Sequence, residues 1–124
     1  MDFTLKQYEL LIDTLKNNNY QFLSFDNYIR KFDSIKDDDL IVILRHDVDD
    51  KPENSLRMAE LEHSFGISGS YYFRAVPCSW NDKIIRSIEE FGHEIGYHYE
   101  TMDTANGDIE KAWGQFKEHL GKLR

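Results

Sequence analysis

The chain has 124 residues, enough for one domain with one hydrophobic core, and its hydrophobic content of 40% is typical of a globular protein. Its 15 Lys and Arg residues against 23 Asp and Glu residues give a net charge of −8, which argues against nucleic acid or an anionic membrane surface as a partner. The single cysteine, Cys78, excludes an internal disulfide and a cysteine-based structural zinc site.

Residues 1–39 are expected to form a helical extension that packs on the rest of the domain. The N-terminus has neither the basic start nor the apolar core of a signal peptide, and no apolar run approaches the ~20 residues that span a bilayer. A cytoplasmic location is therefore the default expectation. Apolar residues at helical spacing predict two helices, on either side of an extended piece at residues 20–25. The stripes are Tyr8, Leu11, Ile12 and Leu15 in the first helix, and Phe25, Tyr28, Ile29 and Phe32 in the second.

Residues 40–50, LIVILRHDVDD, join a β-branched apolar run to a group of charges. The run at residues 40–44 does not alternate polar with apolar residues, so it predicts a strand buried on both faces, as in a parallel sheet. Three carboxylates and an imidazole follow where this strand is expected to reach solvent. In α/β folds, that carboxyl edge of the sheet is where functional sites are built.

Predicted helices and strands alternate over the remaining chain. Helices are expected to begin at Pro52, at residues 79–82 and after Asn106-Gly107, with strands at residues 70–74 and 94–98. The expected buried faces are Met58, Leu61 and Phe65, with Ala59 beside them, in the first of these helices, and Ile109, Ala112, Trp113, Phe116 and Leu120 in the last. This order predicts three parallel strands with right-handed crossovers, so we expect residues 40–124 to be the first βα units of an α/β domain.

Two polar groups fall at the expected strand ends, one at residues 46–50 and one at residues 93–100. If the two strands lie near each other, these ends converge, and carboxylates with imidazoles suit a divalent transition metal. Asp49 and His98 are then candidate ligands. Asp47 lies two residues before Asp49 on the same side of the strand, where it can take a proton from water that a metal acidifies toward a pKa of ~7.

Residues 45–49, 66–73 and 92–98 form three segments that, in this order, resemble motifs of the polysaccharide deacetylases, the NodB-homology family or carbohydrate esterase family 4. Residues 45–49, RHDVD, look like that family's first motif. Residues 92–98, GHEIGYH, are similar to its second motif, Gly-His-Glu-Ile-Gly-x-His, and residues 66–73, GISGSYYF, resemble its connecting strand. The order and spacing agree over residues 40–100, about half of this chain.

The resemblance implies an α/β fold, a partial distorted (β/α)7 barrel with three parallel βα units after an N-terminal helical segment. It implies a divalent metal, Zn²⁺ above all, and hydrolysis of non-peptide C–N amide bonds. The implied substrate is an N-acetylated polysaccharide or amino sugar, or another amide. Carried over by position, Asp47 is the general base, and Asp49 and His98 are metal ligands.

One position departs from the family pattern. Met102 stands where a second histidine ligand is expected, and a thioether is a poor ligand for such a metal. Glu100 is the nearest substitute and the candidate third ligand, with His46 and His93 as the other possibilities. The family's later motifs, an oxyanion-stabilising Arg and a general-acid His, are not identifiable after Glu100, so we expect the 124 residues to be a truncated part of the domain, inactive alone.

Two other functions are compatible with the same residues. A haloacid-dehalogenase-like phosphatase would use Asp47 as nucleophile and Asp49 as acid and base beside Mg²⁺, but it leaves His98 unexplained and has Lys51 where Thr or Val is usual. A non-catalytic carbohydrate-binding module on the same scaffold is the second alternative, and Met102 motivates it. Metal content distinguishes the hydrolase from the module.

Overall fold

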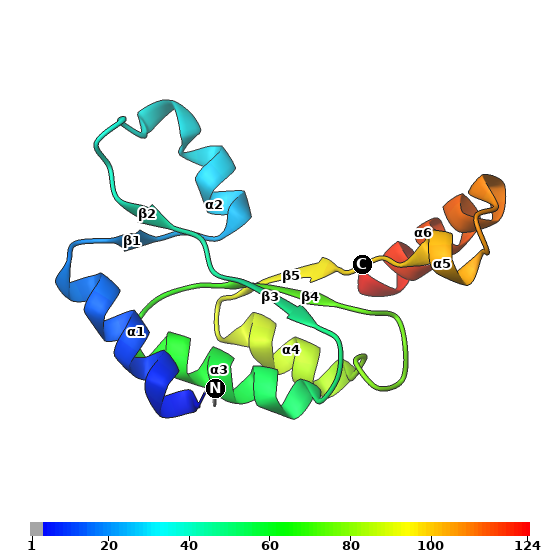
Figure 1. The fold of residues 1–124 in the computed structure, drawn as a ribbon, viewed down its shortest axis with the longest axis horizontal. Helices are drawn as coiled ribbons and strands as arrows, with labels where there is room; N and C mark the ends of the chain where they lie inside the picture. The colour runs from blue at the N-terminus through cyan, green and yellow to red at the C-terminus, as the bar shows by residue number, and fades with distance from the viewer. Residues whose placement is uncertain (1–3) are drawn as a thin grey trace.

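The computed structural model describes residues 4–124, a mixed arrangement of helices and strands (Figure 1). The helices are α1 (Leu5–Asn17), α2 (Phe25–Arg30), the 3-10 turn η1 (Phe32–Ser34), α3 (Pro52–Ser64), α4 (Asp82–Glu90), α5 (Thr101–Thr104) and α6 (Ile109–Leu123). The strands are β1 (Gln21–Phe22), β2 (Ile41–Val42), β3 (Arg45–Val48), β4 (Ser70–Phe73) and β5 (Glu94–Tyr97).

A three-stranded parallel sheet with the strand order β3-β4-β5 is the centre of the fold. Helix α3 connects β3 to β4, and helix α4 connects β4 to β5. Both helices lie along the same face of the sheet, and α5 and α6 project to one side beyond the end of β5 (Figure 1). The two crossover connections therefore place α3 and α4 on one face of the sheet, and neither helix covers the opposite face.

Local sequence signals set the helix ends. Thr4 forms a capping box with Gln7 at the start of α1, and the side chains of Asn81 and Asp108 accept hydrogen bonds from the first turns of α4 and α6. These oxygens satisfy backbone N–H groups that have no partner within the helix. Gly66 follows α3 with φ +70°, a left-handed conformation that costs a glycine little.

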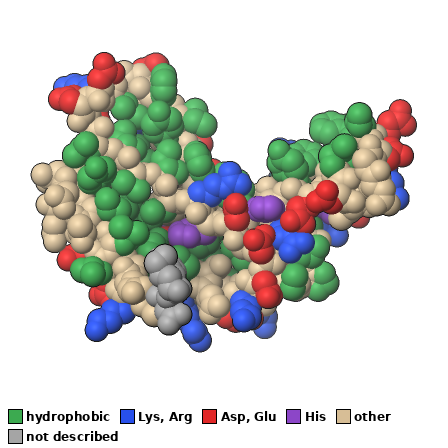
Figure 2. Space-filling view, in the orientation of Figure 1, with side chains coloured by type: hydrophobic (Ala, Val, Ile, Leu, Met, Phe, Trp, Pro, Cys, Tyr) green, Lys and Arg blue, Asp and Glu red, His purple; other side chains and the backbone are tan. Residues whose placement is uncertain are grey.

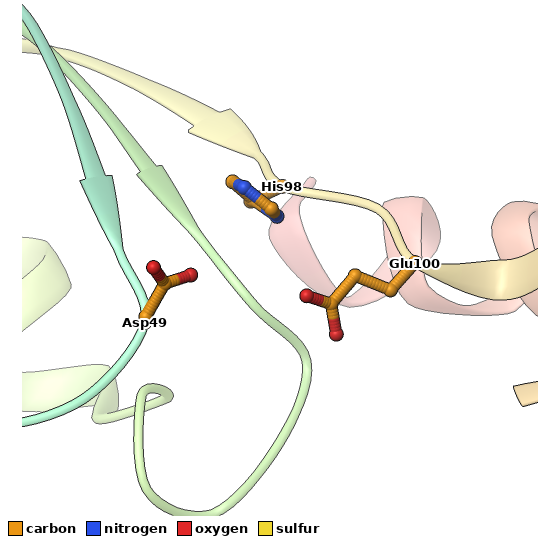
Figure 3. Close-up of side chains that lie close together, drawn as sticks. All are labelled: Asp49, His98 and Glu100. Carbon is orange, nitrogen blue, oxygen red and sulfur yellow. The ribbon is translucent and has the colours of Figure 1, made fainter. Parts of the chain in front are cut away.

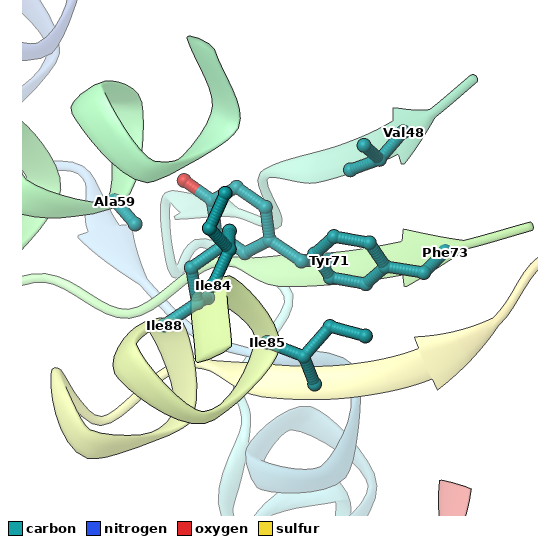
Figure 4. Close-up of a cluster of buried hydrophobic side chains, with 7 residues drawn as sticks. All are labelled: Val48, Ala59, Tyr71, Phe73, Ile84, Ile85 and Ile88. Carbon is teal, nitrogen blue, oxygen red and sulfur yellow. The ribbon is translucent and has the colours of Figure 1, made fainter. Parts of the chain in front are cut away.

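The main core lies between the sheet and helices α3 and α4 (Figure 4). Its buried members are Val48, Ala59, Tyr71, Phe73, Ile84, Ile85 and Ile88. Tyr71 and Phe73 of the central strand are fully buried, and each large side chain of this kind contributes roughly 1.5–3 kcal/mol. Because side chains alternate along a strand, Tyr72 between them points to the opposite face.

The apolar run at residues 40–44 is not the strand buried on both faces that its sequence predicts. It contributes β2, which pairs with β1, while the strand in the main sheet is β3, residues 45–48, which carry the side chains of Arg45, His46 and Asp47 before Val48. Leu40 is 46% exposed and residues 41–44 are half-buried. Charges are tolerated in β3 because its side chains alternate, so that Val48 enters the core while Arg45 and Asp47 reach solvent.

Helix α4 begins at Asp82, within the predicted range of residues 79–82, and Ser79 is fully buried. Two other expectations need correction. In α3 Ala59 is fully buried, as expected, and so is Glu62, while Met58 and Leu61 of α3 and Phe65 directly after it are only half-buried. In α6, Ile109 and Trp113 are 73% and 58% exposed, because only the turns near Ala112 and the later apolar residues touch other elements.

The expected N-terminal extension is helical in α1 and α2, and α1 packs against α3. Strand β1 of this extension pairs with β2, which lies beyond residue 39, the expected boundary between the extension and the rest of the domain. The position of that boundary therefore stays a prediction. Residues 1–3 of the extension lie outside the described residues.

Residues 4–124 form two separate parallel sheets of two and three strands, so a partial (β/α)7 barrel also stays a prediction. Within residues 4–124, no helix is both long enough and apolar enough to cross a bilayer.

Candidate metal centre

The candidate ligands stand at the carboxyl ends of β3 and β5, the two parallel strands on either side of β4. The last residues of β3, β4 and β5 are in register with one another. The next residues along the three strands are Asp49, Arg74 and His98, which therefore fall in one row across the end of the sheet. Glu100 follows two residues after His98, at the start of α5, and points back toward the row (Figure 3).

The structure brings Asp49, His98 and Glu100 together, with one possible ligand atom from each lying within 4.8 Å of the others. Asp49 is exposed, and His98 and Glu100 are half-buried. Nδ1 of His98 is buried and has no hydrogen-bond partner among the described residues. One imidazole nitrogen and two carboxylates are a donor set that fits zinc or a similar divalent cation.

Asp47 lies beside this group on the same face of the sheet. Its Oδ1 accepts a hydrogen bond from Nε of Arg45 at 2.8 Å, and its Oδ2 lies 3.7 Å from Nε2 of His98. The hydrogen bond to Asp47 raises the pKa of the Arg45 guanidinium, which stays charged. Arg45 thus holds one carboxylate oxygen, and the other faces the candidate ligands.

Arg74 sits between the two ligand-bearing segments. Its Nε and Nη2 donate to Oε2 of Glu100 at 3.0 and 2.7 Å, and its Nη1 donates to the backbone oxygen of Asp49 at 3.3 Å. The hydrogen bond to Glu100 raises the pKa of the Arg74 guanidinium. Acidic, basic and histidine side chains gather where the chain leaves the sheet toward α5 (Figure 2).

A tyrosine and a glycine lie next to Asp47 on the same face of the sheet. Register places Asp47, Tyr72 and Gly96 in one row across the three strands. The Arg45 guanidinium lies over the Tyr72 ring, 4.5 Å from its centroid. A side chain at position 96 would collide with that ring, so the glycine allows Tyr72 to lie flat across β5.

The two alternative histidine ligands lie away from this group. His93 is buried, where its Nδ1 accepts a hydrogen bond from Gly69 N–H and its Nε2 donates to the Ala59 carbonyl oxygen. His46 points to the opposite face of the sheet from Asp47. Met102 lies in α5 and is 50% exposed. Of the residues considered as third ligand, only Glu100 joins the group.

The sequence interpretation missed Glu62, which is fully buried behind the sheet. Its carboxylate accepts hydrogen bonds from the hydroxyl groups of Tyr8 and Tyr71 at 2.5 and 2.7 Å and contacts Nε2 of His46 at 2.5 Å. A signal was present, because Glu62 follows Met58 by four residues and so occupies the inward face of α3. An acidic residue inside an apolar stripe indicates a buried polar partner.

No protein-family model matches the chain, and comparisons with curated proteins and with solved structures also find no match. The chemistry proposed for this protein therefore depends on the geometry of its own residues and on the motifs in its sequence.

Proposed function

We propose that this chain is part of a metal-dependent hydrolase that cleaves non-peptide C–N amide bonds. Its proposed substrates are N-acetylated polysaccharides or amino sugars. The observation that carries the proposal is the convergence of Asp49, His98 and Glu100 within 4.8 Å at two strand ends, beside Asp47. The resemblance of residues 45–49 and 92–98 to the deacetylase motifs supports the same chemistry. The proposed fold is the first part of the (β/α)7 barrel that this resemblance implies.

In this proposal Asp49, His98 and Glu100 hold Zn²⁺, and Asp47 moves the proton. The cation, when bound, polarises the amide carbonyl and makes water more acidic. Oδ2 of Asp47 accepts the proton of the attacking water, because Oδ1 is already held by Arg45. The water oxygen bonds to the acetamide carbon, the C–N bond breaks, and the proton held by Asp47 passes to the leaving nitrogen, which gives acetic acid and the free amine.

Zinc binding by the whole chain tests the proposal. We expect the protein to take up one Zn²⁺, and Asp49→Ala and His98→Ala to lose it, with stoichiometry measured by calorimetry and by metal analysis after dialysis. Asp103→Ala and His63→Ala, which change exposed residues of the same types, are the matched controls. Absence of zinc uptake by the wild-type chain would overturn the hydrolase proposal, and uptake by His98→Ala would show the ligand set to be wrong.

A second candidate function is carbohydrate binding without catalysis. A hollow of about 330 Å³ next to Glu100 is lined by apolar residues and Thr101, and Tyr99 and Trp113 within it are 66% and 58% exposed. Exposed aromatic surfaces of this kind mark binding sites. Binding of N-acetylglucosamine oligomers by a zinc-free protein, lost in Trp113→Ala, would favour this function, whereas hydrolysis of p-nitrophenyl phosphate would favour the phosphatase alternative.

A further inference from the structure

Arg74 has a position that the proposed metal chemistry does not explain. It is the first residue after the central strand β4, and it stands in the row between Asp49 and His98. A positive charge in the middle of a cation site has two opposite interpretations. It either fills the place of the cation or holds the ligands around that place.

The contacts of Arg74 favour the second interpretation. Both Nε and Nη2 donate to the same oxygen of Glu100, Oε2, so these contacts leave Oε1 free to face a cation. The contact with Asp49 goes to its backbone oxygen and leaves the carboxylate free. A guanidinium that filled the cation's place would instead bond to the carboxylates of both Asp49 and Glu100, whereas the bond of Arg74 to Asp49 goes to the backbone oxygen.

The surroundings of Arg74 fix its own backbone. The Ser79 hydroxyl is fully buried, donates to the backbone oxygen of Val48 and accepts a hydrogen bond from the backbone N–H of Arg74 at 3.0 Å. One side chain therefore ties the ends of β3 and β4 together, directly before Asp49 and Arg74. From this fixed position the planar fork of an arginine can reach both neighbouring segments at once, which a lysine cannot do.

We infer that Arg74 is a positioning residue that joins the Asp49 and Glu100 segments and orients the Glu100 carboxylate for the cation. The inference rests on the proposed function, because it assigns Arg74 a part in the same site. Hydrogen-bonded partners of metal ligands commonly change affinity when they are replaced, by about 10- to 100-fold.

Zinc titrations of the whole chain test the inference. We expect Arg74→Gln and Arg74→Lys to weaken Zn²⁺ binding by about 10- to 100-fold, with the far-UV circular dichroism spectrum unchanged. If Arg74 acts through Glu100, adding Arg74→Gln to Glu100→Gln changes the affinity by less than about threefold. Arg30→Gln, which removes an exposed arginine paired with Asp26 in α2, is the control and keeps wild-type affinity.

A spectroscopic readout separates the two interpretations directly. The Nε–H of Arg74 is bonded to Glu100, so its NMR signal should persist and sharpen when Zn²⁺ is added. Loss of that signal on zinc binding, or equal or tighter zinc binding by Arg74→Gln, would overturn the positioning role and leave the metal centre standing. A wild-type chain that binds no Zn²⁺ would overturn the metal centre itself, and the positioning role with it.

Discussion

Nε2 of His46 lies 2.5 Å from Oε1 of Glu62, and this pair is the centre of a buried polar cluster behind the sheet. The His46 ring also stacks on the Tyr71 ring, with centroids 4.4 Å apart. In strand β3, the His46 side chain therefore lies in this cluster, and the side chain of the next residue, Asp47, lies on the opposite face of the sheet. The cluster fixes the strand on which the candidate metal centre is built.

Glu62→Gln is expected to lower the free energy of unfolding by about 1–3 kcal/mol, the usual cost of leaving a buried hydrogen-bonding group without its partner. The carboxylate offers two acceptor oxygens to His46, Tyr8 and Tyr71, whereas an amide offers only one. Urea unfolding followed by circular dichroism measures the change. Glu60→Gln on the exposed side of α3 is the control, and a loss of less than about 1 kcal/mol for Glu62→Gln would contradict the buried pair.

Stability is expected to decrease as the pH falls from 7 to 4. Burial lowers the pKa of His93 below its ordinary value of 6.5, although the Ala59 carbonyl and the Glu62 carboxylate partly oppose this. Burial alone would raise the pKa of Glu62, but hydrogen bonds, chiefly from His46, hold it below its ordinary value of 4.5. The unfolded chain therefore takes up each proton at a higher pH than the folded chain does, so protonation favours unfolding.

The pH effect has two steps that can be separated. The first loss of stability occurs below about pH 6.5 and is due to protonation of His93. The second occurs below about pH 4.5 and is due to protonation of Glu62. Urea unfolding at a series of pH values measures both. His93→Gln can keep both hydrogen bonds without titrating, so it should remove the first step only. A free energy of unfolding that stays constant between pH 7 and pH 5 in the wild-type chain would argue against a buried neutral His93.

Gly96→Ala is expected to destabilise the protein by about 1–3 kcal/mol, because its Cβ would collide with the Tyr72 ring that lies across it. The matched control is Gly114→Ala in α6, where nothing lies within 4 Å of the added carbon and alanine is expected to stabilise the helix by up to about 1 kcal/mol. Thermal unfolding measures both variants. If the collision is the cause, Gly96→Ala costs less in a Tyr72→Ala background, and an equal cost in both backgrounds would refute it.

Asp47→Asn is expected to leave zinc binding close to the wild-type level and to reduce hydrolysis by about 100-fold or more, the usual contribution of a general base. Asp47 does not belong to the three-residue ligand group, and its free Oδ2 faces that group. Calorimetry measures zinc binding, and acetate release from N-acetylglucosamine oligomers measures hydrolysis. The hydrolysis assay uses a form of the domain for which the unmutated protein releases acetate. Loss of zinc from Asp47→Asn would make Asp47 a ligand instead.

Much of the local structure could be predicted because it depends on local interactions. Thr4 begins a helix through hydrogen bonds within three residues of chain, and Gly66 ends one through its own backbone freedom. Asp49 and His98 could be selected as partners because parallel strands end at the same edge, and Glu100 because it lies near His98 in sequence. Spacing along the chain was enough for these inferences.

The sequence by itself determined most of the alternation of helices and strands, with the exception of β3, η1 and α5, and the chemical types available for a site. The tertiary structure decided which face each strand residue occupies, and so placed Arg45 and Asp47 inside β3 instead of after a buried strand. It also decided that Glu62 is buried against His46 and that Arg74 reaches Glu100. These contacts join residues far apart in the chain, and their energies depend on burial and orientation, which exist only once the helices have packed on the sheet.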